Sequence, residues 1–208
     1  MVQAIPQFTT FDEFIAWYPA DGRYELINGR VCEVKPTGLH EQVGGYLNRR
    51  LSVEMDRLEL PYFIPKSFTV KPFSEQSGYL SDVVVVDQTK LADEARWQRE
   101  STLMRGLSMP LVVEVVSTNW RDDYQRKAAD YEEMGIPEFW LVDYLGLGGR
   151  RYIGTPKQPT FSVYQWVDGE YQVTLFQGAA RILSPTFPDL ALTLDQILQH
   201  VDVRVDQP

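Results

Sequence analysis

Cysteine, histidine and long apolar runs are scarce in this 208-residue sequence, and each shortage excludes a class of protein. The single cysteine, Cys32, excludes an internal disulfide framework and suits a reducing cytoplasm, where we expect the protein to act. Two histidines are too few for a histidine-rich zinc site. No apolar run approaches the ~20 residues of a membrane span, and the first residues lack the basic and apolar stretches of a signal peptide. We therefore expect no membrane partner.

Positive charge is also in short supply, with 20 basic against 29 acidic residues and a net charge of −9. This balance argues against a protein that coats nucleic acid non-specifically, because such binding depends on Lys and Arg neutralising phosphates. A locally basic cleft is still compatible with it. Two groups of basic residues are candidates: Arg49, Arg50 and Arg57 on one expected helix, and Arg121, Arg126 and Lys127 later in the chain. For either group taken alone, solvated surface charge is the simpler interpretation.

Length and composition predict one domain over residues 1–208. The apolar fraction of 44% and the charged fraction of 24% are those of an ordinary globular chain with a sizeable core. The pattern of elements predicts a core over about residues 8–144, followed by a β-rich extension over about 150–208.

Local signals place the elements along the chain. Thr10 and Glu13 form a capping-box pattern before a short helix, and Asn28-Gly29 marks a hairpin inside RYELINGRVCEV. Apolar residues recur every four positions from His40 to about residue 58, which predicts an amphipathic helix. YFIPKSFTVKPF predicts short strands, and residues 88–109 predict a long loop with a helical turn.

The second half of the chain predicts a strand–helix–strand unit. SDVVVVD and PLVVEVVS have the apolar character of buried strands, and RDDYQRKAADYEEMG predicts a helix that ends at Gly135. The strand IPEFWLVDY follows at once, which favours parallel pairing with PLVVEVVS. Two strands around Asp168-Gly169 and a short helix near 194–200 complete the chain. The fold class is α/β, a mixed central sheet flanked by helices with a β-rich C-terminal part.

Two of these strands carry carboxylates where the apolar pattern favours none. Asp82 opens the VVVV run, and Glu114 interrupts LVVEVVS. A lone buried carboxylate costs several kcal/mol, and two held together repel one another unless a cation lies between them. Oxygen ligands without histidine or thiolate favour a hard ion such as Mg²⁺. Taken separately, Asp82 also suits a strand-start turn, and Glu114 also suits a salt bridge or an edge strand.

Lys127 lies on the helix that follows Glu114, with Asp123 and Tyr131 four residues to either side. This spacing puts the three side chains on one helix face, and a helix that folds back over the strand would bring the ammonium to the carboxylates. The alternative is a solvated lysine paired within its own helix.

The order Asp, Glu, Lys resembles the PD-(D/E)XK nuclease superfamily. More closely, the chain resembles the bacterial Uma-type family of restriction-endonuclease-like proteins. The resemblance rests on YELINGRV, the turn from Pro36 to His40, SDVVVVD, LVVEVVS and the K…Y…GIPEFWLVD segment, in order from about Phe8 to Tyr144. Each motif alone is weak, whereas the ordered set is specific.

The chain departs from the superfamily motif at two positions. Ser81 replaces the usual proline before the aspartate, and Val116 replaces the lysine of E-x-K. The Uma-type resemblance implies that this lysine has moved onto the following helix, as Lys127. It also nominates Glu25 as a further acidic residue near the metal, and His40 as a substrate-binding residue. A solvent-facing hairpin position and a helix-start position are the respective alternatives.

A literal D…E-x-K pattern also occurs earlier in the sequence. Asp21 precedes Glu33-Val34-Lys35, which matches the motif letter for letter. However, Asp21 lies in a Gly-containing turn and Glu33 at the exit of the hairpin, with no apolar run to bury either. The pattern predicts surface positions there.

The resemblance implies a nuclease with Mg²⁺, or Mn²⁺ in its place, held by Asp82, Glu114 and the backbone carbonyl of Val115. The implied partner is nucleic acid, with DNA expected, and Lys127 would orient the attacking water or stabilise charge on the phosphate. The alternative is a nuclease fold without turnover that binds nucleic acid or a protein. A small-phosphoester hydrolase ranks last, because Gly146, Gly148 and Gly149 suit a turn better than a phosphate loop.

We also expect a homodimer, because cutting both strands of a duplex requires two sites. The C-terminal strands carry aromatic residues suited to such an interface, namely Tyr164, Trp166, Tyr171 and Phe176. Ordinary core packing is the alternative for these four residues.

Overall fold

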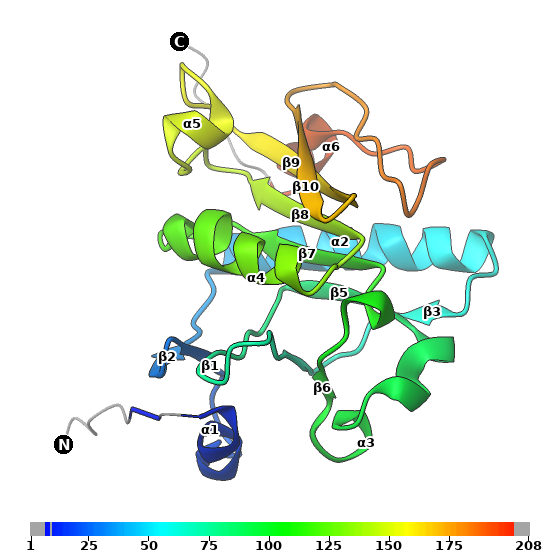
Figure 1. Cartoon of the computed structure of the whole chain (residues 1–208). Coiled ribbons are helices and arrows are strands. Elements are labelled where there is room, and N and C mark those ends of the chain that lie inside the picture. Colours follow the sequence, from blue (N-terminus) through cyan, green and yellow to red (C-terminus); the bar gives the residue numbers. More distant parts are fainter. Residues whose placement is uncertain (1–6, 9, 202–208) are drawn as a thin grey trace.

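A six-stranded mixed sheet forms the centre of the molecule, as seen in a computed structural model that describes residues 7–8 and 10–201 (Figure 1). Its strand order is β10-β9-β8-β7-β5-β3. The strands are β3 (Tyr62–Phe63), β5 (Val83–Asp87), β7 (Leu111–Val115), β8 (Glu138–Asp143), β9 (Thr160–Val167) and β10 (Glu170–Phe176). β7 and β8 pair in parallel, and the other neighbours in this sheet pair antiparallel. The predicted strand–helix–strand unit is therefore confirmed.

Helices cover both faces of the sheet, and smaller strand pairs lie beside it. The helices are α1 (Phe11–Trp17), α2 (Gly38–Arg57), α3 (Trp97–Glu100), α4 (Ala128–Glu133), α5 (Arg150–Ile153) and α6 (Leu194–His200), with 3₁₀ turns η1 (Gln88–Asp93) and η2 (Gly106–Ser108). The small pairs are the hairpin β1 (Tyr24–Ile27) with β2 (Arg30–Glu33), and parallel β4 (Thr69–Val70) with β6 (Thr102–Leu103). No described helix has the length and apolarity to cross a membrane.

The alternation of side chains along β7 divides the core in two. Leu111, Val113 and Val115 pack with α2 and α6, whereas Val112 and Val116 pack with α4 on the opposite face. Each of these side chains is buried, and such burial stabilises the fold by about 1.5–3 kcal/mol per residue. Glu114 lies between Val112 and Val116, so period-two alternation turns it towards the α4 face.

The expected turns and caps form where the sequence places them. Asn28 and Gly29 both adopt positive φ (48° and 76°), as a two-residue hairpin turn requires. Thr10 and Glu13 make both hydrogen bonds of a capping box at α1. Gly135, with φ of 68°, follows the end of α4.

Three features differ from the sequence-based expectations. The helix expected over residues 121–135 begins as a π-helix, η3 (Asp122–Lys127), before it continues as α4. Residues 150–153 form the short α5, at the start of the extension that was expected to be β-rich. Of the aromatic residues on the C-terminal strands, Tyr164 and Phe176 are core residues, whereas Trp166 is 40% exposed.

Candidate active site

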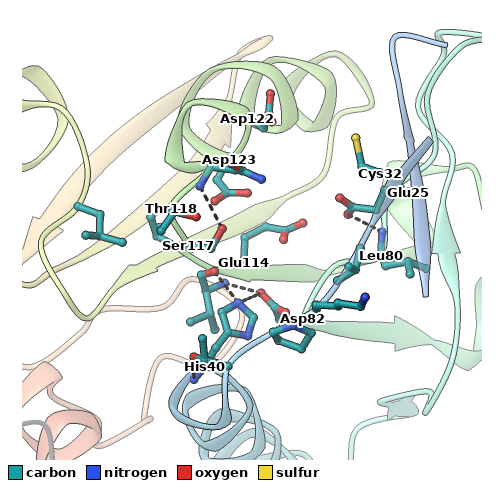
Figure 2. Close-up of a pocket in the computed structure, with 18 of the residues that line it drawn as sticks. Glu25, Cys32, His40, Leu80, Asp82, Glu114, Ser117, Thr118, Asp122 and Asp123 are labelled. Carbon is teal, nitrogen blue, oxygen red and sulfur yellow. Dashed lines mark hydrogen bonds and ion pairs between the residues drawn. The ribbon is translucent and has the colours of Figure 1, made fainter. Parts of the chain in front are cut away.

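Among the carboxylates that line one cavity of about 480 Å³, four are largely buried and come from separate parts of the chain (Figure 2). Glu25 lies on β1, Asp82 just before β5, Glu114 on β7 and Asp123 on η3. Figure 2 shows the side chains of Glu25, Asp82 and Glu114 extending into the same space between the hairpin and β7. Lys127 and His40 line this cavity too.

Strand pairing brings Asp82 and Glu114 together. Val83 pairs with Val113 in the antiparallel β5–β7 ladder, so one step further along the ladder Asp82 lies opposite Glu114. Asp82 is fixed in turn by the main-chain amide of Val115, which donates to its Oδ2 at 2.6 Å. The two acidic interruptions of the sequence are therefore neighbours.

Lys127 lies between two of the carboxylates. Its Nζ is 3.0 Å from Oε1 of Glu25 and 3.0 Å from Oε2 of Glu114, and 3.7 Å from Oδ1 of Asp123. Burial alone would lower the pKa of Lys127, but these three carboxylates raise it well above its ordinary value. The lysine therefore carries a permanent positive charge in the interior.

The π-helical turn that ends at Lys127 is the irregular element of the site. π-Turns inside helices are rare and occur often at functional positions. Here the turn carries both Asp123 and Lys127, and the α-helix that follows it carries Tyr131. All three side chains are buried on the face that meets Glu114.

Glu114 has a hydrogen-bond partner on each oxygen. The Tyr131 hydroxyl donates to Oε1 at 2.7 Å, and Lys127 contacts Oε2. Because the single phenolic hydrogen is used on Glu114, the Ser81 hydroxyl donates to the Tyr131 oxygen at 2.8 Å. Burial raises the pKa of Glu114, whereas Lys127 lowers it.

His40 and Asp82 form the opposite wall. His40 Nε2 is 2.9 Å from the Val115 carbonyl oxygen and 3.4 Å from Oδ2 of Asp82. Both neighbours accept hydrogen bonds, so Nε2 carries a hydrogen. Burial lowers the pKa of His40, which favours the neutral ring. Burial and the nearby Glu114 raise the pKa of Asp82 well above its ordinary value.

The donor set fits a hard divalent cation in charge and in ligand chemistry. Four carboxylates face one ammonium, and the mutual repulsion of Asp82 and Glu114 is the interaction that a cation between them would relieve. Within residues 7–8 and 10–201, no three Asp, Glu, His or Cys side chains are arranged to hold a metal ion by themselves. A divalent cation bound here would need water for several of its ligands, as Mg²⁺ commonly does.

The structure thus gathers all six predicted site residues around one cavity. These are Glu25, His40, Asp82, Glu114, Val115 and Lys127. The sequence did not assign a role to Asp123, Tyr131 or Ser81. Asp123 and Tyr131 could have been found from the sequence, because each is four residues from Lys127 and so lies on the same helix face. Ser81 stood out only as a departure from the superfamily motif.

The residues of the literal D…E-x-K pattern lie at the protein surface, as expected. Lys35 pairs with Glu33 at 2.8 Å, and both side chains are exposed at the mouth of the cavity. Asp21 is exposed in its turn. None of the three is buried against a charged partner.

Comparisons with known proteins identify the family and the fold of the chain. The model of the Uma2 family, described as "Putative restriction endonuclease", matches residues 11–195. A solved structure described as "a putative nuclease belonging to DUF820 from Anabaena variabilis ATCC 29413" is similar with a TM-score of 0.70 at 14% identity, over 92% of this chain and 98% of that chain. At this identity the likeness shows the fold, and it confirms the expected nuclease-like architecture. No curated protein matches the chain.

Proposed function

Because the chain belongs to the Uma2 family, we propose that it is a metal-dependent nuclease that hydrolyses phosphodiester bonds, with DNA as its substrate. One observation carries this proposal. Carboxylates of Glu25, Asp82 and Glu114, which come from three separate strands or strand ends, converge on a cavity that also holds the Lys127 ammonium. A hydrolase acting on a phosphate needs both an oxygen-rich cation site and a fixed positive charge.

Each residue has a distinct expected role. Asp82 and Glu114 would hold Mg²⁺, or Mn²⁺ in its place, with the Val115 carbonyl as a further oxygen ligand. The bound ion would supply a more acidic water and offset charge on the scissile phosphate. Lys127 provides a donor and a positive charge beside Glu114. His40 donates its Nε2 hydrogen to the Val115 carbonyl oxygen, and from the wall of the cavity its ring would contact the substrate.

The test is a cleavage assay on supercoiled plasmid and on labelled single strands, with Mg²⁺, Mn²⁺ or EDTA. Wild type is compared with Lys127→Met, which keeps much of the side-chain volume but removes the charge. Lys35→Met, in the superficial D…E-x-K pattern, is the matched control. We expect metal-dependent cutting that Lys127→Met abolishes and Lys35→Met retains. Circular dichroism verifies that each variant is folded.

A second function, a nuclease fold that binds without turnover, is favoured by one observation. Lys127 itself lies at ion-pair distance from Glu25 and Glu114, so part of the acidic charge is already balanced without a metal. This function predicts binding to nucleic acid or protein that is equally strong in EDTA and in Mg²⁺. Absence of cutting under every condition by folded wild-type protein would favour it over the nuclease.

Two further expectations remain proposals. A homodimer would use the outer part of β9 and β10, where Trp166, Val173 and Leu175 are 40%, 47% and 44% exposed. A cytoplasmic location is the expectation drawn from the single, half-buried Cys32.

A further inference from the structure

An acidic cavity in an acidic protein cannot attract a polyanion by itself. The net charge is −9, and six carboxylates line the cavity against two lysines. Nucleic acid that reaches this cavity therefore needs a positive surface beside it. The location of that positive surface is inferred on the basis of the proposed nuclease function.

Two of the three α2 arginines, Arg50 and Arg57, are engaged in structural contacts. Arg57 pairs with Glu54 at 2.7 Å and with Asp189 at 3.3 Å. Arg50 donates to the Tyr46 hydroxyl and to the Ala191 carbonyl. These contacts tie α2 to the C-terminal segment, so Arg50 and Arg57 are poor candidates and only Arg49 of this group is left exposed.

The members of the second basic group, Arg121, Arg126 and Lys127, have different surroundings in the fold. Lys127 is buried in the site, and Arg126 pairs with Asp122 at 2.6 Å. Arg121 remains exposed, and it joins two arginines that are distant in the sequence, Arg150 and Arg151 on α5. Within the part of the chain that the structure describes, these three arginines have no carboxylate partner.

Aromatic rings connect Arg121 and Arg151 into one surface, and Arg150 is the neighbour of Arg151 on α5. Trp120 contacts the Tyr152 ring, with centroids 6.2 Å apart, and this contact joins the start of η3 to α5. The guanidinium of Arg121 lies over the Trp120 ring, and that of Arg151 over the Tyr152 ring, each 4.5 Å from the centroid. Such contacts hold a guanidinium in place without neutralising it.

The surface borders the acidic cavity. Residues 117–119, which directly precede Trp120, line the cavity, as do Leu145 and Leu147, which lead into α5. A chain of phosphates crossing the arginines would therefore meet the cavity at its rim.

We propose that Arg121, Arg150 and Arg151 bind the phosphate backbone of the nucleic-acid strand that enters the cavity. Phosphates suit this surface better than bases, because the arginines already cover faces of the half-buried Trp120 and Tyr152 rings. Arg151 donates one N–H to the Tyr152 hydroxyl, which leaves its other donors and those of Arg121 for phosphate, and phosphate accepts such donors in pairs. Binding here is accordingly independent of base sequence.

The test measures binding, not cleavage, so it is separate from the nuclease proposal. Fluorescein-labelled duplex and single-stranded DNA are titrated in EDTA at several salt concentrations and followed by fluorescence anisotropy. Wild type is compared with the triple variant Arg121→Gln, Arg150→Gln, Arg151→Gln. The control is Arg105→Gln, because Arg105 is exposed, its guanidinium has no carboxylate partner among the described residues, and it lies between β6 and η2, far from α5 (Figure 1).

For duplex DNA we expect the triple variant to bind more weakly and to lose about 0.9 per arginine from the slope of log K against log salt concentration. Arg105→Gln should match wild type. Equal affinity and slope in wild type and the triple variant would overturn the inference, and so would absence of any binding by wild type. Cutting by a triple variant whose binding is unchanged overturns this inference alone. Loss of binding in the variant, with no cutting by wild type, overturns the nuclease alone.

Discussion

Tyr131 donates its phenolic hydrogen to Oε1 of Glu114 at 2.7 Å, from a position on α4 where its own ring is fully buried. Tyr79 packs edge-on against that ring, and Ser81 donates to its hydroxyl. The tyrosine therefore fixes one oxygen of Glu114 and leaves the other to Lys127. A buried carboxylate with two such donors is held in its ionised form more readily than burial alone would allow.

Tyr131→Phe should destabilise the fold by about 1.5–3 kcal/mol, because a hydrogen bond to a charged group is lost in the interior. The free energy of unfolding is measured by urea denaturation in EDTA. Tyr62→Phe is the control, since the Tyr62 hydroxyl is half-buried and has no hydrogen-bond partner in the described part of the chain. Equal losses in both variants would show that the Tyr131–Glu114 contact contributes nothing specific.

Removing the charge of the two expected metal ligands should abolish Mg²⁺ binding. Calorimetric titration of Mg²⁺ into wild type is compared with the double variant Asp82→Asn, Glu114→Gln, which keeps side-chain shape. Asp21→Asn with Glu170→Gln, both at exposed positions that do not line the cavity, is the matched control. Identical heats from wild type and the Asp82/Glu114 variant would refute these two residues as ligands.

Stability without metal should fall as pH rises from about 4 towards neutrality. Burial raises the pKa of Asp123 from 3.8 to about 7, so in this window the folded protein binds the proton that the unfolded chain has lost. The stabilisation is complete below pH 3.8 and is lost as pH rises through about 7, at roughly 1.4 kcal/mol per pKa unit.

Asp123→Asn should flatten this pH dependence of the free energy of unfolding, measured in urea and EDTA between pH 4 and 8. Asp93→Asn, at an exposed position, should leave it unchanged. A profile as steep in Asp123→Asn as in wild type would assign the dependence to other groups.

Replacement of two glycines by alanine should change the stability of the fold in opposite directions. A Cβ on Gly106 would lie 2.2 Å from the Met134 carbonyl oxygen, where backbone must move, so Gly106→Ala should cost several kcal/mol. A Cβ on Gly45, inside α2, would meet nothing within 4 Å, so Gly45→Ala should stabilise the fold by about 1 kcal/mol. Thermal denaturation compares the two, and a stabilised Gly106→Ala would contradict the packing of η2 against α4.

The proposed dimer should depend on the exposed apolar residues of β10. Val173→Lys places a charge on this edge strand of the sheet and should convert a dimer to a monomer in light scattering coupled to gel filtration. Val53→Lys, at a 62% exposed position on α2, is the control. A wild type that is monomeric at all concentrations would remove the dimer from consideration.

The sequence predicted those parts of the fold that local chemistry determines. The hairpin follows from Asn28-Gly29, because both residues tolerate positive φ, and Glu114 was conspicuous because a charge interrupts an apolar run. The π-helical turn before Ala128 has no such signal, since the same residues suit an ordinary α-helix. The surface of Arg121 and Arg151 was equally hidden, because it exists only once Trp120 meets Tyr152 in space.

The sequence could not show which charged side chains pair with one another. Lys127 was expected near Glu114, but nothing local indicates that Glu25, on a separate hairpin, shares its ammonium. Ion pairs between distant segments depend on how sheets and helices pack, which periodicity does not encode.

The parallel pairing of β7 with β8 also has a kinetic consequence. Parallel neighbours join only after the intervening crossover has formed, and non-local pairing of this kind slows folding. Glu114 and Lys127 flank the beginning of that crossover, so their charges lose water only when it docks on the sheet. We therefore expect the carboxylates around Lys127 to be desolvated late in folding. The ion pairs of Lys127 should then form in one of the last steps that lead to the native state.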